Sequence, residues 1–155
     1  MNGAHLHLLL SHVAPIGGFF TLLLFIFALI QKNKELKRTA LWFTFFTGIS
    51  ALVTFMTGDS AEEIVKKIPG ISDTQIEFHE MMAMFYLISL IVVGVMAVVG
   101  LFLSRASTSV LHKFTVIVFI LLLLTSYLAV MTSLTGGKIR HSEIENTIPA
   151  KPPVK

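Results

Sequence analysis

Four long stretches without a charged side chain dominate this sequence: Val13–Ile30, Ala40–Thr57, Met81–Leu103 and Phe114–Gly137. At about 1.5 Å of helix rise per residue, each reaches roughly 27 Å or more, enough to cross a hydrocarbon layer about 30 Å thick once flanking residues are added. Because 54% of the 155 residues are hydrophobic and only 14% are charged, the chain is too apolar for an ordinary soluble domain. The sequence therefore predicts an all-α membrane protein, a bundle of four transmembrane helices.

The segments outside these stretches define the expected domain organisation. We predict one four-helix transmembrane domain over residues 1–141 and a flexible tail over residues 142–155, because the closing sequence IPAKPPVK lacks a core pattern. The acidic loop GDSAEEIVKKIPGISDTQIE joins the second and third stretches, and Asp59–Lys67 is expected to form a short interfacial helix that ends before Pro69. No internal repeat is recognised.

Positive charge is distributed unequally between the two sides of the predicted bundle. Six cationic residues lie in the first and third loops: Lys32, Lys34, Lys37, Arg38, Arg105 and Lys113. Four lie near the membrane on the other side: Lys66, Lys67, Lys138 and Arg140. This bias predicts basic loops in the cytoplasm and both termini on the outer face of a bacterial inner membrane. No basic helix face is interleaved with aromatic residues, so the lipid bilayer, and not a nucleic acid, is the expected partner.

Several chemistries are excluded by the residues that are missing. The chain has no cysteine, which rules out disulfides, thiolate-bound zinc, iron-sulfur clusters and covalently attached c-type haem. It has no nucleophile-base constellation, metalloprotease motif, phosphate loop or dinucleotide fingerprint, so an enzymatic role is not predicted. No charge lies near the centre of a predicted span, which argues against an ion or proton pathway.

The histidines provide the sharpest functional hypothesis. His12 lies immediately before the first apolar stretch and His79 two residues before the third, so both are expected at the same outer depth on different helices. A b-type haem held by two imidazoles requires such a pair. We therefore expect one haem b between His12 and His79, in a redox subunit that passes electrons to a membrane or periplasmic partner or to a quinone. His7 and His141 are further candidate ligands on the same side.

Helical geometry restricts which histidines of the first segment can act together. In a continuous helix the side chain of His7 would lie about 140° around the axis from that of His12. Pro15 cannot donate a hydrogen bond to the Ser11 carbonyl, which favours a helix start or a kink nearby. His7 can therefore join the site only if the chain before His12 leaves that helix.

Two other interpretations remain open. His79 and Met82 are spaced i, i+3 on one helix, and imidazole with thioether suits copper(I), so a copper site is the alternative. In the third interpretation no cofactor is bound, and the chain is a structural or assembly subunit of a homo- or hetero-oligomeric membrane complex. A stripe of small residues along 40–61 fits close helix packing or a cofactor slot. Asp59 and Glu80 are candidate partners of imidazole N–H groups.

Short motifs at the expected helix ends suggest a family. The sequences HLLLSHVAPIG at residues 7–17, TGD after the second span, a histidine at the start of the third and GG at the end of the fourth resemble the bacterial four-helix membrane family catalogued as domain of unknown function 2231. The resemblance covers about His5 to His141. It implies four helices and a role for His7, His12 and His79, and it names no reaction.

Overall fold

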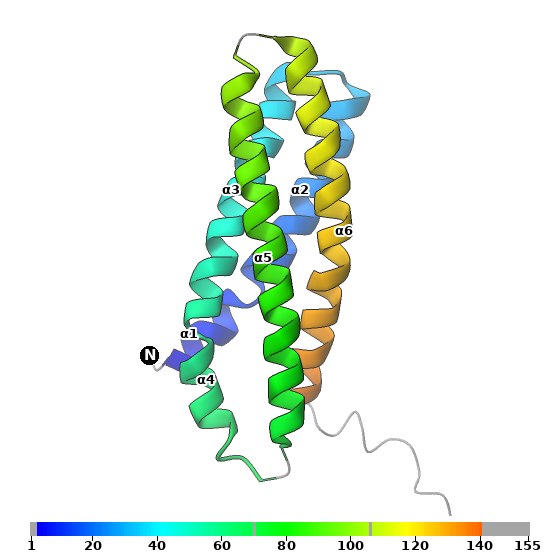
Figure 1. Cartoon of the computed structure of the whole chain (residues 1–155). Helices are drawn as coiled ribbons and strands as arrows, with labels where there is room; N and C mark the ends of the chain where they lie inside the picture. The colour runs from blue at the N-terminus through cyan, green and yellow to red at the C-terminus, as the bar shows by residue number, and fades with distance from the viewer. Residues whose placement is uncertain (1–2, 70, 106, 141–155) are drawn as a thin grey trace, which may run out of the picture.

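Helices form most of the described residues in a computed structural model that describes residues 3–69, 71–105 and 107–140 (Figure 1). In chain order they are α1 (Gly3–Leu10), α2 (Val13–Ile30), α3 (Lys34–Met56), α4 (Gly58–Val65), α5 (Asp73–Leu103) and α6 (Thr108–Arg140). The described residues contain no strand. The predicted tail and His141 lie outside the described residues.

Four helical segments are long and apolar enough to cross a membrane. They are α1 with α2, α3 with α4, α5, and α6. The predicted fold class, an all-α membrane protein with four transmembrane helices, is confirmed, and the chain is an integral membrane protein. The first apolar stretch coincides with α2, and the predicted interfacial helix corresponds to α4, which begins one residue earlier than expected and ends two residues sooner.

The long helices pack in the cyclic order α2, α3, α5, α6, with a smaller diagonal contact between α3 and α6. The α2–α3 and α5–α6 connections lie at one end, which we call the basic end because it holds the six cationic residues of the first and third loops. Helices α1 and α4, the start of α5 and the last turn of α6 lie at the opposite end, which we call the acidic end (Figure 1). Both described chain ends therefore lie at the acidic end.

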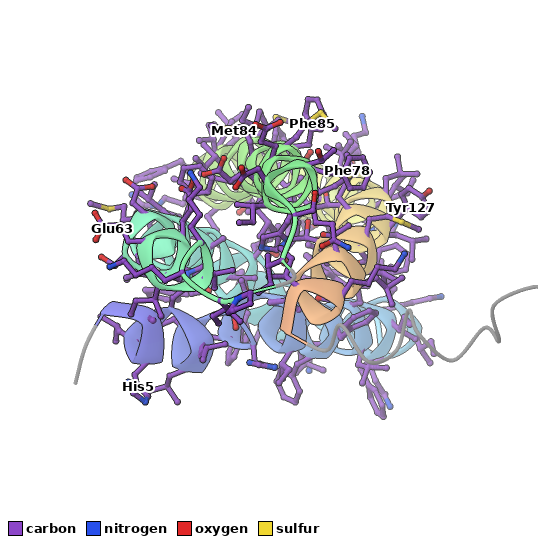
Figure 2. All side chains as sticks on the ribbon, turned by 90° about the horizontal axis from the view of Figure 1, so that it is seen from below. His5, Glu63, Phe78, Met84, Phe85 and Tyr127 are labelled. Carbon is purple, nitrogen blue, oxygen red and sulfur yellow. The ribbon has the colours of Figure 1, made fainter. Side chains whose placement is uncertain are left out.

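Large apolar side chains cover the outside of the bundle. Figure 2 shows Phe78, Met84 and Phe85 of α5 and Tyr127 of α6 pointing away from the helices, and their exposed fractions range from 43% to 64%. The centre contains many small residues, including Ala28, Ala40 and Ala97, each with no exposed surface. This arrangement suits a bilayer, because lipid solvates the outer side chains while small residues let the helix backbones approach closely.

Glycines mark the closest helix crossings. A Cβ on Gly17 of α2 would lie 3.2 Å from Thr47 Oγ1 of α3, and one on Gly48 of α3 would lie 3.3 Å from the Leu90 carbonyl oxygen of α5. Most of the predicted small-residue stripe is therefore occupied by helix packing. Only its outer part, beyond Ala51, remains near a candidate site.

The tightest crossing gives a stability prediction. A Cβ on Gly100 of α5 would lie 2.7 Å from the Phe114 Cβ of α6, and Phe114 cannot rotate that atom away. Gly100→Ala is therefore expected to lower the free energy of unfolding by about 1–3 kcal/mol. Gly137→Ala is the matched control, because a Cβ there meets nothing within 4 Å and alanine is the better helix former. Thermal unfolding in detergent, followed by circular dichroism, measures both; equal stability of the two variants would contradict the prediction.

The first membrane segment is broken between α1 and α2. Helix α2 begins after His12, with Pro15 in its first turn, where a missing N–H has no intrahelical partner to lose. Helix α1 leaves the bundle axis and crosses beside α4 (Figure 1). The Thr54 hydroxyl of α3 donates to the Leu10 carbonyl oxygen at 3.1 Å, and a Cβ on Gly3 would overlap Ser60 of α4. These contacts fix α1 on the corner formed by α3 and α4.

Candidate cofactor site at the acidic end

Two half-buried histidines from different helices lie at the acidic end. His7 belongs to α1, and His79 lies in the second turn of α5, which begins after Ser72. The backbone N–H of Ser72 donates to Gln75 Oε1 at 3.4 Å, which helps to fix this helix start. His7 and His79 are both half-buried at this end, and each ring hydrogen-bonds to a threonine of another helix.

The His7 ring is held by the last turn of α3. Its Nδ1 lies 3.1 Å from Thr57 Oγ1 and 3.2 Å from the Thr54 carbonyl oxygen. The Thr57 hydroxyl itself donates to that carbonyl. Because a carbonyl can only accept, His7 Nδ1 must carry the proton that donates to both oxygens.

The His79 ring is held in the same way by α6. Its Nδ1 lies 3.0 Å from Thr135 Oγ1, and the Thr135 hydroxyl donates to the Thr132 carbonyl oxygen at 3.0 Å. The ring also hydrogen-bonds to the Thr132 backbone. Since the Thr135 proton is already used, its oxygen accepts from His79 Nδ1–H.

Both clamps contain the short pattern T-x-x-T-G, which reads TFMTG at residues 54–58 and TSLTG at residues 132–136. The same pattern recurs as TFFTG at residues 44–48, where both threonine hydroxyls donate to carbonyls of their own helix. In the two clamps the last threonine hydroxyl meets Nδ1 and the glycine lies against the ring. A Cβ on Gly58 would lie 4.0 Å from His7 Cε1, and one on Gly136 would lie 2.9 Å from His79 Cε1. Because one copy lies in the middle of α3 with its hydroxyls bonded within that helix, the pattern alone does not identify the clamps, and the expectation of no internal repeat stays a prediction.

The clamps determine which ring nitrogen can bind a metal. With the proton on Nδ1, a neutral imidazole carries its free lone pair on Nε2. Metal-binding histidines generally donate their other N–H to a carbonyl, carboxylate or water, which fixes the tautomer and increases the basicity of the ligating nitrogen. His7 and His79 each have this arrangement, with threonine oxygens as the acceptors.

The two histidines are held by different helices. Helix α1 packs on α4, α3 and α2, and α4 packs on α1 and α3, whereas α1 and α4 have almost no contact with α5 or α6. His7 is held by α3 and His79 by α6, so the two rings come from different parts of the bundle.

One buried polar atom lies beside His79 without a partner. The Thr132 hydroxyl is shielded from solvent and makes no hydrogen bond within the described part of the chain. A buried hydroxyl without a partner is rare in proteins and calls for an explanation, such as a bound group. It lies one turn from Gly136, the residue in contact with the His79 ring.

The hydrogen bonds of His12 stay within its own segment, and its predicted pairing with His79 stays a prediction. His12 is exposed, and its Nδ1 bonds to the Leu8 carbonyl oxygen at 3.1 Å and to the Ser11 hydroxyl at 3.3 Å, both in its own segment. The break before α2 turns α1 across the bundle, so His7 reaches the position expected for His12. The condition stated for His7, that the chain before His12 leaves the helix, is met.

The other candidate ligands are placed less centrally. Met82 is half-buried one turn further along α5 from His79, and His5 is exposed and points away from the helices in Figure 2. His141 is outside the described residues. At the basic end, His112 Nδ1 accepts a hydrogen bond from the buried Lys37 Nζ at 3.3 Å, far from the pair.

Asp59 and Glu80 do not supply the hydrogen bonds described for the imidazoles. Their carboxylates instead meet that of Glu62, with one oxygen of each within 4.8 Å of the others. Glu62 also pairs with Lys66, and the hydrogen bond and charge of Glu62 raise the pKa of Lys66. The expectation that these acids orient the histidines is corrected, because threonines occupy that role.

A hollow of about 290 Å³ lies away from the pair, between α5 and α6. Its lining contains no histidine and consists of Ile88, Ser89, Val92, Val93, Leu121, Leu124, Thr125 and Leu128. A group held by both histidines would lie at the acidic end of the bundle, beyond the tightly packed helix crossings.

Comparisons with known proteins give no information on the function. No family model, no curated protein and no solved structure matches this chain. The family resemblance stays a prediction. The chain is an integral membrane protein with four helical spans, and its most developed candidate site is the histidine pair at the acidic end.

Proposed function

We propose that this protein is an electron-transfer subunit that binds one haem b at the acidic end, with His7 and His79 as axial ligands. The observation that carries the proposal is that threonines of α3 and α6 hold Nδ1 of His7 and His79, which leaves Nε2 of each ring as the ligating nitrogen. Two neutral imidazoles from facing helices are the donor set of a b-type haem.

The surrounding residues fit this assignment. The buried Thr132 hydroxyl, which lacks a partner among the described residues, offers a hydrogen bond to a polar edge of the bound group. His112 is the single histidine of the basic end and hydrogen-bonds to Lys37, so that end offers no second bis-histidine site and we propose one haem. Bound haem would supply reversible one-electron chemistry, and the histidines would hold and orient it near the membrane surface.

The expected cellular setting follows from the charge bias of the sequence. The six cationic residues of the basic end favour a cytoplasmic position for that end, which places the histidine pair on the outer side of a bacterial inner membrane. There the site is within reach of a periplasmic or membrane redox partner or a quinone.

The decisive test is an optical spectrum of the full chain, purified in detergent from cells with an adequate haem supply. We expect a Soret band in the air-oxidised protein, sharp α and β bands after dithionite reduction, and about one haem per chain. Metal analysis of the same sample separates the alternatives. Copper without haem would replace this proposal with a copper site that includes Met82, and a colourless protein without metal would leave a structural or assembly subunit.

A further inference from the structure

A small hollow at the basic end combines two arginines with apolar walls. It has a volume of about 170 Å³, and it is lined by Arg38 and Trp42 of α3, Leu101 of α5 and Arg105 just after α5. Helices α3 and α5 are packed neighbours, so the hollow lies between two spans at the end of the bundle opposite the histidine pair.

The positive charge of this hollow is not neutralised by the protein. Among the described residues the one ion pair is that of Lys66 with Glu62, at the acidic end. In residues 31–38 and 104–113, which form the basic end, the sequence has one acidic residue, Glu35. The Arg105 guanidinium lies 4.8 Å from the centre of the Phe102 ring, which orients it and leaves its N–H groups for an acceptor.

The apolar walls lie one turn deeper into the membrane than the arginines. Trp42 follows Arg38 by four residues along α3, and Leu101 precedes Arg105 by four residues along the chain. Trp42 is 46% exposed and stacks on Phe46 with 6.0 Å between ring centres. Tryptophan is typical of the membrane interface, where the headgroup layer meets the acyl chains. The hollow therefore has charge at headgroup depth and apolar surface at acyl-chain depth.

We propose that this hollow binds the phosphate headgroup of an anionic phospholipid, with Arg38 and Arg105 on the phosphate and Trp42 and Leu101 against the upper acyl chain. Arginine pairs with phosphate through two parallel N–H···O bonds, and basic recesses between membrane helices are suited to anionic headgroups. This site is independent of the histidine pair.

Trp42 is the single tryptophan of the chain, so its fluorescence reports on this hollow. The full-length protein is reconstituted in phosphatidylcholine vesicles that contain a minor fraction of brominated lipid, which quenches a nearby indole. We expect brominated phosphatidylglycerol to be enriched about tenfold at Trp42 over brominated phosphatidylcholine at the same mole fraction. Equal quenching by the two lipids overturns the proposal.

Charge variants and free phosphate distinguish lipid binding in the hollow from general attraction of anionic lipid to a positively charged surface. Arg38→Gln/Arg105→Gln is expected to remove the preference, while Lys34→Gln/Lys113→Gln, which removes the same charge outside the hollow, is expected to keep it. An equal loss in both double variants overturns the proposal in favour of a diffuse surface potential. Loss of quenching on addition of millimolar inorganic phosphate at constant ionic strength also overturns it, because the site would then select a soluble phosphate.

Discussion

Loss of either His7 or His79 is expected to abolish haem binding, while loss of His12 is expected to leave it intact. His7→Ala and His79→Ala each remove one of the two proposed ligands, whose rings are held by threonines of α3 and α6. His12→Ala removes an exposed ring whose hydrogen bonds stay within its own segment. The measurement is the Soret absorbance per mole of purified protein, with the reduced α band as a second readout of bis-histidine ligation.

The three alanine variants distinguish two ligand assignments. If His12→Ala loses the haem and His7→Ala keeps it, the pairing expected from sequence depth is right and the clamp at Thr54 and Thr57 has another purpose. Circular dichroism of each variant separates loss of ligand from loss of fold. Since His7 lies in α1, outside the four-helix core, His7→Ala is expected to keep the helix content of the wild-type protein.

Removing a clamp hydroxyl is expected to weaken haem binding without removing a ligand. Thr57→Val and Thr135→Val each delete the oxygen that accepts from Nδ1 of one histidine and keep the side-chain volume. Loss of such a partner costs about tenfold to a hundredfold in metal affinity, because the ring is less firmly oriented and its ligating nitrogen is less basic. The transfer of haem from the reduced and the oxidised protein to excess apomyoglobin measures this change as a rate.

Thr44→Val is the matched control for the clamp variants. Thr44 is fully buried in α3, and its hydroxyl donates to the Ala40 carbonyl oxygen of the same helix at 2.9 Å. The Thr44→Val change removes a threonine hydroxyl that is bonded only within α3. The haem transfer rate is therefore expected to match that of the wild-type protein. Equal rates in Thr44→Val, Thr57→Val and Thr135→Val would contradict a role for the threonines in holding the ligands.

Hydropathy was sufficient to predict the membrane spans. A stretch such as Val13–Ile30 must satisfy its backbone hydrogen bonds internally once it is in lipid, and helix formation does this with local contacts alone. The same holds for the acidic loop, where Pro69 and Gly70 limit the short helix that precedes them. These features depend on neighbouring residues in the chain, so the sequence carries them directly.

The membrane depth expected from sequence position was not sufficient to choose between the two candidate haem ligands of the first segment. His7 and His12 lie five residues apart, and both are near the membrane surface by sequence position. The difference arises from the direction of α1, which depends on the break near Pro15 and on the contact of Thr54 with Leu10, a residue 44 positions away. The pattern T-x-x-T-G was also not sufficient, because it occurs three times in the chain and only the copies at residues 54–58 and 132–136 hold a histidine.

By itself the sequence determined that this protein is a four-helix membrane protein with its histidines concentrated toward one end, because apolar length and charge placement act locally. Only the tertiary structure decided that His7 is held by α3 and His79 by α6, that threonines hold both rings, and that two arginines meet beside Trp42. Side-chain direction at a contact between helices depends on helix breaks and crossings. Those are set by packing between residues distant in the chain.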